Sequence, residues 1–159
     1  MGRKKRRPSD RSKWTITDWQ GWLWPLFSRY IRLRDCIKTT GTTDWGLCRT
    51  CQRKYHFKRL QAGHFIPGRM RAVLFDPRCV HIQCYRCNRV IKEVWPAYYR
   101  FMQKEYGQEL VEELIDLYMV DAELTPEWFE QSYKYYGWCV DEMLRTGQLV
   151  EGTPQIATG

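Results

Sequence analysis

The chain has 159 residues, a length that suits one compact domain with short arms better than two domains with separate cores. Its basic start is followed by polar residues, and the next aromatic stretch is interrupted by Asp18, Gln20 and Pro25, so no secretory signal peptide is expected. No run approaches the roughly 20 apolar residues that span a membrane. We therefore expect a soluble, cytoplasmic protein without a membrane partner.

The formal net charge of +8 conceals a strong asymmetry. Residues 1–100 carry 23 Lys or Arg against 6 Asp or Glu, a net +17, whereas residues 101–159 carry 3 against 12, a net −9. A basic half of this size indicates a polyanionic partner, most commonly nucleic acid. An anionic membrane surface is the weaker alternative, because no amphipathic helix with a basic face is evident.

Residues 1–13 lack apolar periodicity and repel one another, which predicts a disordered basic arm. A solvated tail and a nuclear address are alternatives, but contact with DNA phosphates is our preferred interpretation. The residues assigned to that contact are Arg3, Lys4, Lys5, Arg6 and Arg7.

Residues 14–35 form an aromatic and basic segment in which a helix is predicted to begin at Pro25, a favourable first helical residue. We favour packing over base stacking for its aromatic side chains. Residues 36–50 are rich in Thr and Gly and are predicted to be a loop.

Two short extended segments, Leu60–Arg69 and Leu74–Gln83, are predicted around a turn that contains Pro67 and Gly68. A helix is expected to begin close to Cys87.

Residues 97–146 are predicted to form a C-terminal helical region, followed by a flexible tail over residues 147–159. The first of these helices covers residues 97–106 and ends at Gly107. Thr125 is expected to cap the last helix.

Two Cys-x-x-Cys pairs, separated by 32 residues, stand in the middle of the chain. Two such pairs supply the four thiolates of a tetrahedral zinc site, and four protein ligands make that zinc structural. Buried or redox-active thiols are the alternative. The predicted zinc ligands are Cys48, Cys51, Cys84 and Cys87, whereas Cys36 and Cys139 are expected to be ordinary packed thiols.

The insertion between the pairs, together with Asn88 directly after the second pair, carries the residues of chemical interest. The sequence resembles the HNH endonucleases in three features: His64 inside the insertion, the two cysteine pairs, and Asn88. The resemblance is closer to the phage recombination nuclease family of lambda NinG, through Tyr30-Ile-Arg-Leu-Arg-Asp35, Ala62-Gly-His-Phe65 and Val80-His-x-Gln-Cys-x-x-Cys-Asn88. A more distant similarity is to phage recombination endonuclease VII.

These resemblances imply an α+β fold in which residues 36–96 form a zinc-stapled, treble-clef ββα-metal centre between N-terminal and C-terminal helices. They imply a DNA endonuclease acting on branched or recombination-intermediate DNA, such as Holliday junctions, D-loops or flaps, in the host cell cytoplasm if the chain is phage-encoded. His64 would be the general base, and Asn88 a ligand of catalytic Mg²⁺ or Mn²⁺. Without the resemblance, His64 is more simply a structural histidine and Asn88 a helix cap.

Two positions depart from the HNH pattern. Gly63 stands where many of these enzymes have an acidic metal ligand, and Cys79 stands at the central Asn position. His81 is the first substitute for the missing carboxylate, ahead of Asp76 and Gln61, although a buried strand residue is an equally simple interpretation of His81.

Basic residues around these motifs are expected to contact DNA phosphates without reading sequence. They are Arg69, Arg71, Arg86, Arg89 and Lys92. A junction-cutting enzyme would need paired active sites, so a homodimer joined through the N-terminal and C-terminal helices is conceivable. A non-catalytic zinc-finger DNA-binding protein is the alternative function, because of Gly63.

Overall fold

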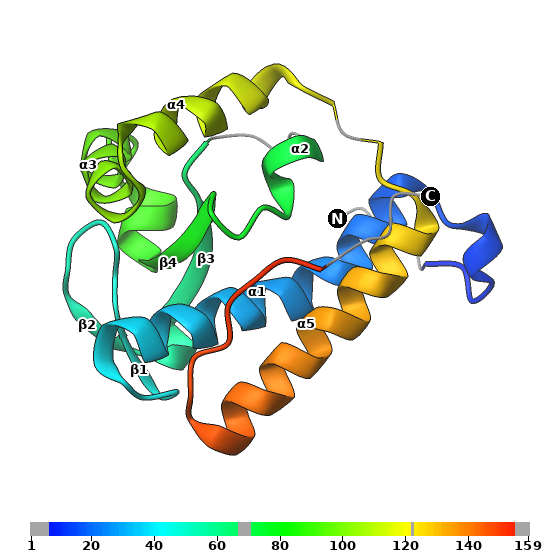
Figure 1. Cartoon of the computed structure of the whole chain (residues 1–159), viewed down its shortest axis with the longest axis horizontal. Coiled ribbons are helices and arrows are strands. Elements are labelled where there is room, and N and C mark those ends of the chain that lie inside the picture. The colour runs from blue at the N-terminus through cyan, green and yellow to red at the C-terminus, as the bar shows by residue number, and fades with distance from the viewer. Residues whose placement is uncertain (1–6, 67–70, 122, 155–159) are drawn as a thin grey trace.

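A computed structural model describes residues 7–66, 71–121 and 123–154 (Figure 1). Helices dominate, and two small antiparallel sheets, β1–β2 and β3–β4, complete an α+β fold. The elements in chain order are η1 (Arg11–Lys13), α1 (Ile16–Thr40), β1 (Trp45–Leu47), β2 (Lys54–His56), η2 (Phe57–Arg59), β3 (Leu60–His64), α2 (Arg71–Leu74), β4 (Val80–Cys84), η3 (Arg86–Val90), α3 (Trp95–Tyr106), α4 (Gln108–Asp116), η4 (Leu117–Met119) and α5 (Pro126–Thr146).

Helix α1 begins well before Pro25, so the predicted start of this helix was wrong. Thr15 accepts a hydrogen bond from the Asp18 amide, and the Asp18 carboxylate accepts one from the Thr15 amide, which completes a capping box. Pro25 removes one intrahelical hydrogen bond, but tertiary packing of the flanking turns offsets that loss. The helix also extends to Thr40, into the predicted loop, where Gly41 ends it with φ 73°.

The long helices α1 and α5 run in the same direction and pack through aromatic side chains (Figure 1). The rings of Trp22 and Tyr133 stack with centroids 4.0 Å apart, and Trp19 stacks on Phe129 at 5.8 Å. The preference for packing over base stacking therefore holds for these rings. These rings pack within the chain, and the homodimer stays a prediction.

Strands β3 and β4 pair antiparallel as predicted, with His64 opposite Val80 and Gln61 opposite Gln83. The first strand ends at His64, before the predicted Arg69, and the predicted turn at Pro67 and Gly68 lies outside the described residues. The second extended segment begins later than expected, because residues 71–74 are helical (α2) and the strand starts at Val80. Helices α3 and α5 confirm two predicted ends: Gly107 caps α3 with φ 83°, and Thr125 caps α5.

A buried ion network joins α1 to the free edge of β4. Arg34 donates to the Asp35 carboxylate at 2.7 Å and to the Val80 carbonyl at 2.8 Å. The same carboxylate accepts the Ile82 amide at 2.9 Å and lies 3.2 Å from Nδ1 of His81. Although burial opposes ionisation, Arg34 and His81 hold the pKa of Asp35 well below its usual range.

No helix in the described parts of the chain combines the length and the apolar character needed to cross a membrane.

Asp35→Asn is expected to lower the free energy of unfolding by about 3–5 kcal/mol, because it leaves the buried Arg34 charge without a carboxylate. Because the pKa of Asp35 is lower in the folded than in the unfolded state, the ionised carboxylate stabilises the fold at pH values above its unfolded-state pKa. That stabilisation is lost as the pH falls, so the free energy of unfolding of the wild type should decrease below about pH 4. Urea denaturation across pH measures both effects. The exposed Asp141→Asn serves as control, and wild-type stability in Asp35→Asn would contradict the role of this network.

Candidate metal centre and adjoining cavity

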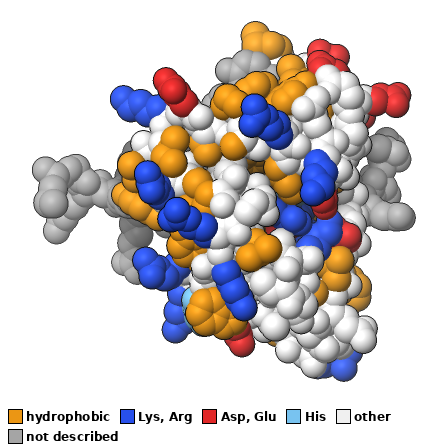
Figure 2. Space-filling view, turned by 90° about the vertical axis from the view of Figure 1, so that its left-hand side faces the viewer, with side chains coloured by type: hydrophobic (Ala, Val, Ile, Leu, Met, Phe, Trp, Pro, Cys, Tyr) orange, Lys and Arg blue, Asp and Glu red, His pale blue; other side chains and the backbone are white. Residues whose placement is uncertain are grey.

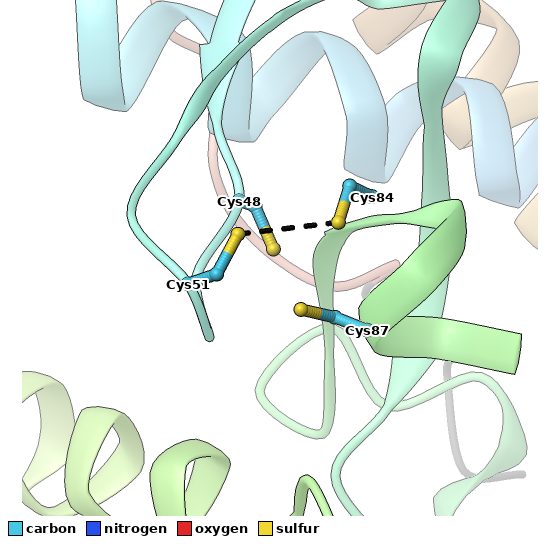
Figure 3. Close-up of side chains that lie close together, drawn as sticks. All are labelled: Cys48, Cys51, Cys84 and Cys87. Atoms are coloured by element: carbon cyan, nitrogen blue, oxygen red, sulfur yellow. Dashed lines mark hydrogen bonds between the residues drawn. The ribbon is translucent and has the colours of Figure 1, made fainter. Parts of the chain in front are cut away.

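The four cysteines of the two pairs converge, as their spacing predicted. Cys48 and Cys51 belong to the turn between β1 and β2, whereas Cys84 ends β4 and Cys87 lies in η3. Their sulfur atoms all lie within 4.8 Å of one another and point toward a common centre (Figure 3). The Cys51 and Cys84 sulfurs are 3.9 Å apart. This group can hold a metal ion and is compatible with structural zinc.

The local chain geometry sets the first pair. The Cys48 amide donates to the Arg53 carbonyl at 3.0 Å, and the Gln52 amide donates to the Cys48 carbonyl at 2.8 Å. Gln52 takes φ 58°, a left-handed conformation that few residues other than glycine and asparagine adopt readily. The tight turn brings the two thiols onto the same side.

The surroundings of these thiols give Cys84 and Cys87 different pKa values. Burial opposes ionisation of Cys84, but hydrogen bonds from the Cys87 backbone and the Tyr55 hydroxyl lower the Cys84 pKa to about 7. Burial raises the pKa of Cys87 to about 12. Full ionisation of the group therefore needs a cation, whose charge favours the thiolate forms.

A cavity of about 590 Å³ adjoins this centre. Elements distant in sequence contribute to its walls: α1, β3, β4, η3 and α3. Its lining includes two of the three residues that the sequence nominated for chemistry, His64 and Asn88 but not His81, together with Trp24, Gln83 and Trp95. The fold thus brings the nominated base and the nominated ligand into one cavity.

The His64 ring is held in a defined orientation. Its Nε2 lies 3.0 Å from the Leu74 carbonyl, an acceptor only, so Nε2 carries a proton in that contact. The ring stacks on Trp24 with centroids 5.1 Å apart and an interplanar angle of 17°. In the neutral ring the basic lone pair therefore resides on Nδ1.

The amide side chains of Gln83 and Asn88 lie beside Gly63. Asn88 donates through Nδ2 to Oε1 of Gln61 at 2.7 Å, and Gln83 donates through Nε2 to Oγ1 of Thr50 at 3.3 Å. Both amide oxygens consequently face Gly63: a Cβ added there would lie 1.9 Å from Oε1 of Gln83 and 3.0 Å from Oδ1 of Asn88. A side chain at position 63 would displace the Gln83 amide, because two amide oxygens take the space beside the glycine.

The substitutes proposed for the missing carboxylate lie elsewhere. His81 is fully buried, and its ring nitrogens contact Asp35, Arg34, the Arg78 carbonyl and Tyr106. Burial lowers the His81 pKa, which keeps the ring neutral. We therefore withdraw His81 as a ligand, because its nitrogens support the fold at the edge of β4. Asp76 pairs with Arg78 at 2.7 Å and lines a separate hollow, whereas Gln61 orients Asn88.

Sequence reasoning overlooked Gln83 and Trp24. The strand register could have revealed Gln83, because it faces Gln61 across the hairpin and directly precedes a predicted zinc ligand. Trp24 gave no such signal, since only tertiary packing brings α1 against β3.

The predicted phosphate contacts are only partly described. Arg86, Arg89 and Lys92 are exposed, and the last two line the cavity. The guanidinium of Arg7 lies 5.0 Å from the ring of Trp14. Five of the nominated residues, Arg3, Lys4, Lys5, Arg6 and Arg69, lie outside the described residues, as does the side chain of Arg71.

Comparison with known families gives one assignment. The family described as Bacteriophage Lambda NinG protein matches residues 2–139, so the chain belongs to the lambda NinG family. Neither the curated proteins nor the solved structures include a match. Membership suggests a role in phage recombination.

Purified protein is expected to contain about one tightly held zinc ion per chain. Cys84→Ser should lose the ion and unfold, because the free energy of metal binding contributes directly to the stability of the fold at such sites. Metal analysis and circular dichroism measure the two effects. Cys139→Ser, which alters a buried thiol outside the cluster, should keep the zinc. A well-folded wild-type protein without zinc would refute the assignment.

Proposed function

We propose that this NinG-family protein is an HNH-type, divalent-metal-dependent endodeoxyribonuclease for branched or recombination-intermediate DNA. The observation that carries the proposal is the shared cavity of His64, Asn88 and Gln83 beside the four-cysteine centre. It provides a base, oxygen ligands and a structural anchor within one small region.

His64 is suited to activating water. Its Nε2 proton is committed to the Leu74 carbonyl, which directs the basic character of the neutral ring to Nδ1. The Trp24 stack restricts rotation of the ring. A histidine whose ring is held by such contacts is suited to withdrawing a proton from an attacking water.

The oxygen atoms near Gly63 fit a hard cation. Oε1 of Gln83 and Oδ1 of Asn88 converge on one space, and hydrogen bonds of both amide nitrogens fix which atom faces it. Oxygen ligands suit Mg²⁺ and Mn²⁺. When bound, such an ion would neutralise negative charge on the phosphate and on the leaving oxygen. Gln83 thereby replaces the carboxylate missing at Gly63, and Asn88 keeps its proposed role.

The chain order around the centre agrees with a ββα-metal core. Strand β3 is followed by the short helix α2, by strand β4 and by the short helical segment η3, and the second cysteine pair spans the β4–η3 junction. At the central Asn position, the Cys79 backbone carbonyl accepts the Phe65 amide at 2.7 Å. A main-chain contact thus braces this loop without the usual side chain.

Several features support DNA as the substrate. The basic residues Arg86, Arg89 and Lys92 are exposed around η3, and two of them reach the cavity. Lysine and arginine at such positions contact phosphates and position the duplex. The preference for branched DNA rests on the family and on its suggested recombination role.

One observation favours the alternative, a non-catalytic zinc-finger DNA-binding protein. None of the described residues that line the cavity is acidic. An ion held only by neutral amides binds less tightly than one held by carboxylates. Incubation of the purified protein with labelled linear, flap and four-way DNA, with Mg²⁺, Mn²⁺ or neither, separates the two functions.

His64→Ala should keep zinc, fold and DNA affinity but lower the cleavage rate by at least ~10²-fold, the lower range for general acid and base catalysis. Asn88→Ala should also cleave slowly, and higher Mn²⁺ should partly restore it, since mass action refills a weakened ion site. Single-turnover cleavage of branched DNA measures both variants. His56→Ala, outside the cavity lining, is the control. Wild-type rates in His64→Ala would disprove the base assignment.

Gln83→Ala is expected to weaken Mn²⁺ binding by about tenfold or more, because one ligand oxygen is removed, whereas Gln83→Glu should strengthen it through a full charge. Gly63→Ala should weaken binding as well, since its Cβ displaces the Gln83 amide. Electron paramagnetic resonance of Mn²⁺ titrated into zinc-loaded protein measures affinity independently of cleavage. Exposed Gln148→Ala is the control, and equal affinities in all variants would remove Gln83 from the site.

A further inference from the structure

The segment from Tyr85 to Trp95 presents apolar and basic side chains side by side. Tyr85, Val90, Ile91 and Trp95 are large hydrophobic residues that are exposed at 62%, 57%, 38% and 41%. The exposed cations of the same segment are Arg86, Arg89 and Lys92, and Glu93 is its one acidic residue. The face of the molecule that bears α3 likewise shows Lys and Arg interspersed with hydrophobic side chains (Figure 2). Such mixing is typical of a surface that binds single-stranded nucleic acid.

Trp95 is built as a platform at the cavity. Its ring stacks on Phe65 with centroids 5.6 Å apart and an interplanar angle of 17°, and it lies 4.9 Å from Tyr99. These contacts support the indole from inside, while 41% of the residue stays exposed. A rigid indole with accessible surface is a suitable partner for a planar ring.

The cavity has room for such a ring. Its volume of about 590 Å³ lies within the range of small-molecule sites, and apolar side chains such as Phe65, Ile91 and Val94 line it together with Trp95. Arg89 and Lys92 line the same cavity and supply positive charge. An apolar space with an aromatic platform and cations fits a base that is joined to a phosphate.

We propose that this cavity receives an unstacked nucleobase of the DNA substrate, which stacks on Trp95 while Arg89 and Lys92 contact the adjoining phosphates. The inference rests on the proposed function and names its substrate more closely. In an intact duplex the base faces are covered by neighbouring bases, so only DNA with unpaired or unstacked nucleotides can fill the cavity. Branch points, flaps and single-stranded gaps expose such nucleotides, and recognition of one of them would favour branched DNA over duplex.

The test measures binding without cleavage. A flap or four-way DNA with 2-aminopurine at the branch point is titrated with zinc-loaded protein, without Mg²⁺ or Mn²⁺. Wild-type protein should quench the fluorescence by stacking and should prefer this DNA to a duplex of equal length. Trp95→Ala should lose the quenching, and its preference for branched DNA over duplex should fall about tenfold while its affinity for duplex stays unchanged. Trp95→Phe should retain most of both, which separates stacking from a folding defect.

Two controls complete the design. Trp138→Ala removes a tryptophan that is more exposed than Trp95, at 56%, and lies outside the cavity lining, and this variant should behave as wild type. Lys92→Ala should weaken binding of branched DNA and reduce its salt dependence while keeping the quenching of bound DNA, as expected of a phosphate contact. Full quenching and preference in Trp95→Ala would overturn the nucleobase site but leave the nuclease proposal intact. A wild-type protein that binds branched DNA and duplex equally would overturn the nucleobase site and the preference for branched DNA, but not metal-dependent cleavage of DNA. Absence of any DNA binding by wild type would overturn both.

Discussion

The buried carboxylate of Asp35 is the contact on which the arrangement of this protein depends. A charge removed from water is tolerated only with strong partners, and Asp35 finds them in the Arg34 guanidinium and the Ile82 amide. Because Ile82 belongs to β4, this pairing fixes the strand against α1. Strand β4 also carries Gln83 and Cys84, so the position of both the cavity and the metal centre follows from the Asp35 contact.

The metal centre and the cavity are connected through shared residues and contacts. Thr50, between the first two cysteines, lies 3.2 Å from the Cys48 sulfur and accepts the amide of Gln83 at 3.3 Å. On the other side, Asn88 follows Cys87 directly along the chain. An ion that orders the cysteines would therefore also order the two amide oxygens beside Gly63. At Gly63, the Gln83 amide occupies the space that a Cβ would take.

The charge asymmetry of the sequence has a structural counterpart. Acidic residues of the C-terminal half neutralise some of the basic ones: Glu105 and Glu151 pair with Lys38 at 3.3 Å and 2.7 Å, and Glu113 pairs with Arg78 at 3.2 Å. Over the ranges that the structure describes, Arg86, Arg89 and Lys92 take part in no such pair. Positive charge is thus retained next to the cavity, where the proposed function needs it.

The sequence by itself determined the features that depend on local spacing and local capping. The two cysteine pairs, the hairpin that carries His64 and the capped ends of α3 and α5 follow from such patterns. Only the tertiary structure decided what long-range contacts control. Aromatic packing against α5 stabilises α1 as a continuous helix that includes Pro25. Burial against Asp35 makes His81 a structural residue. Strand register places Gln83 beside Asn88. Two side chains of the same residue type, such as His64 and His81, differ in role because they contact different residues. Those contacting residues come from distant parts of the sequence.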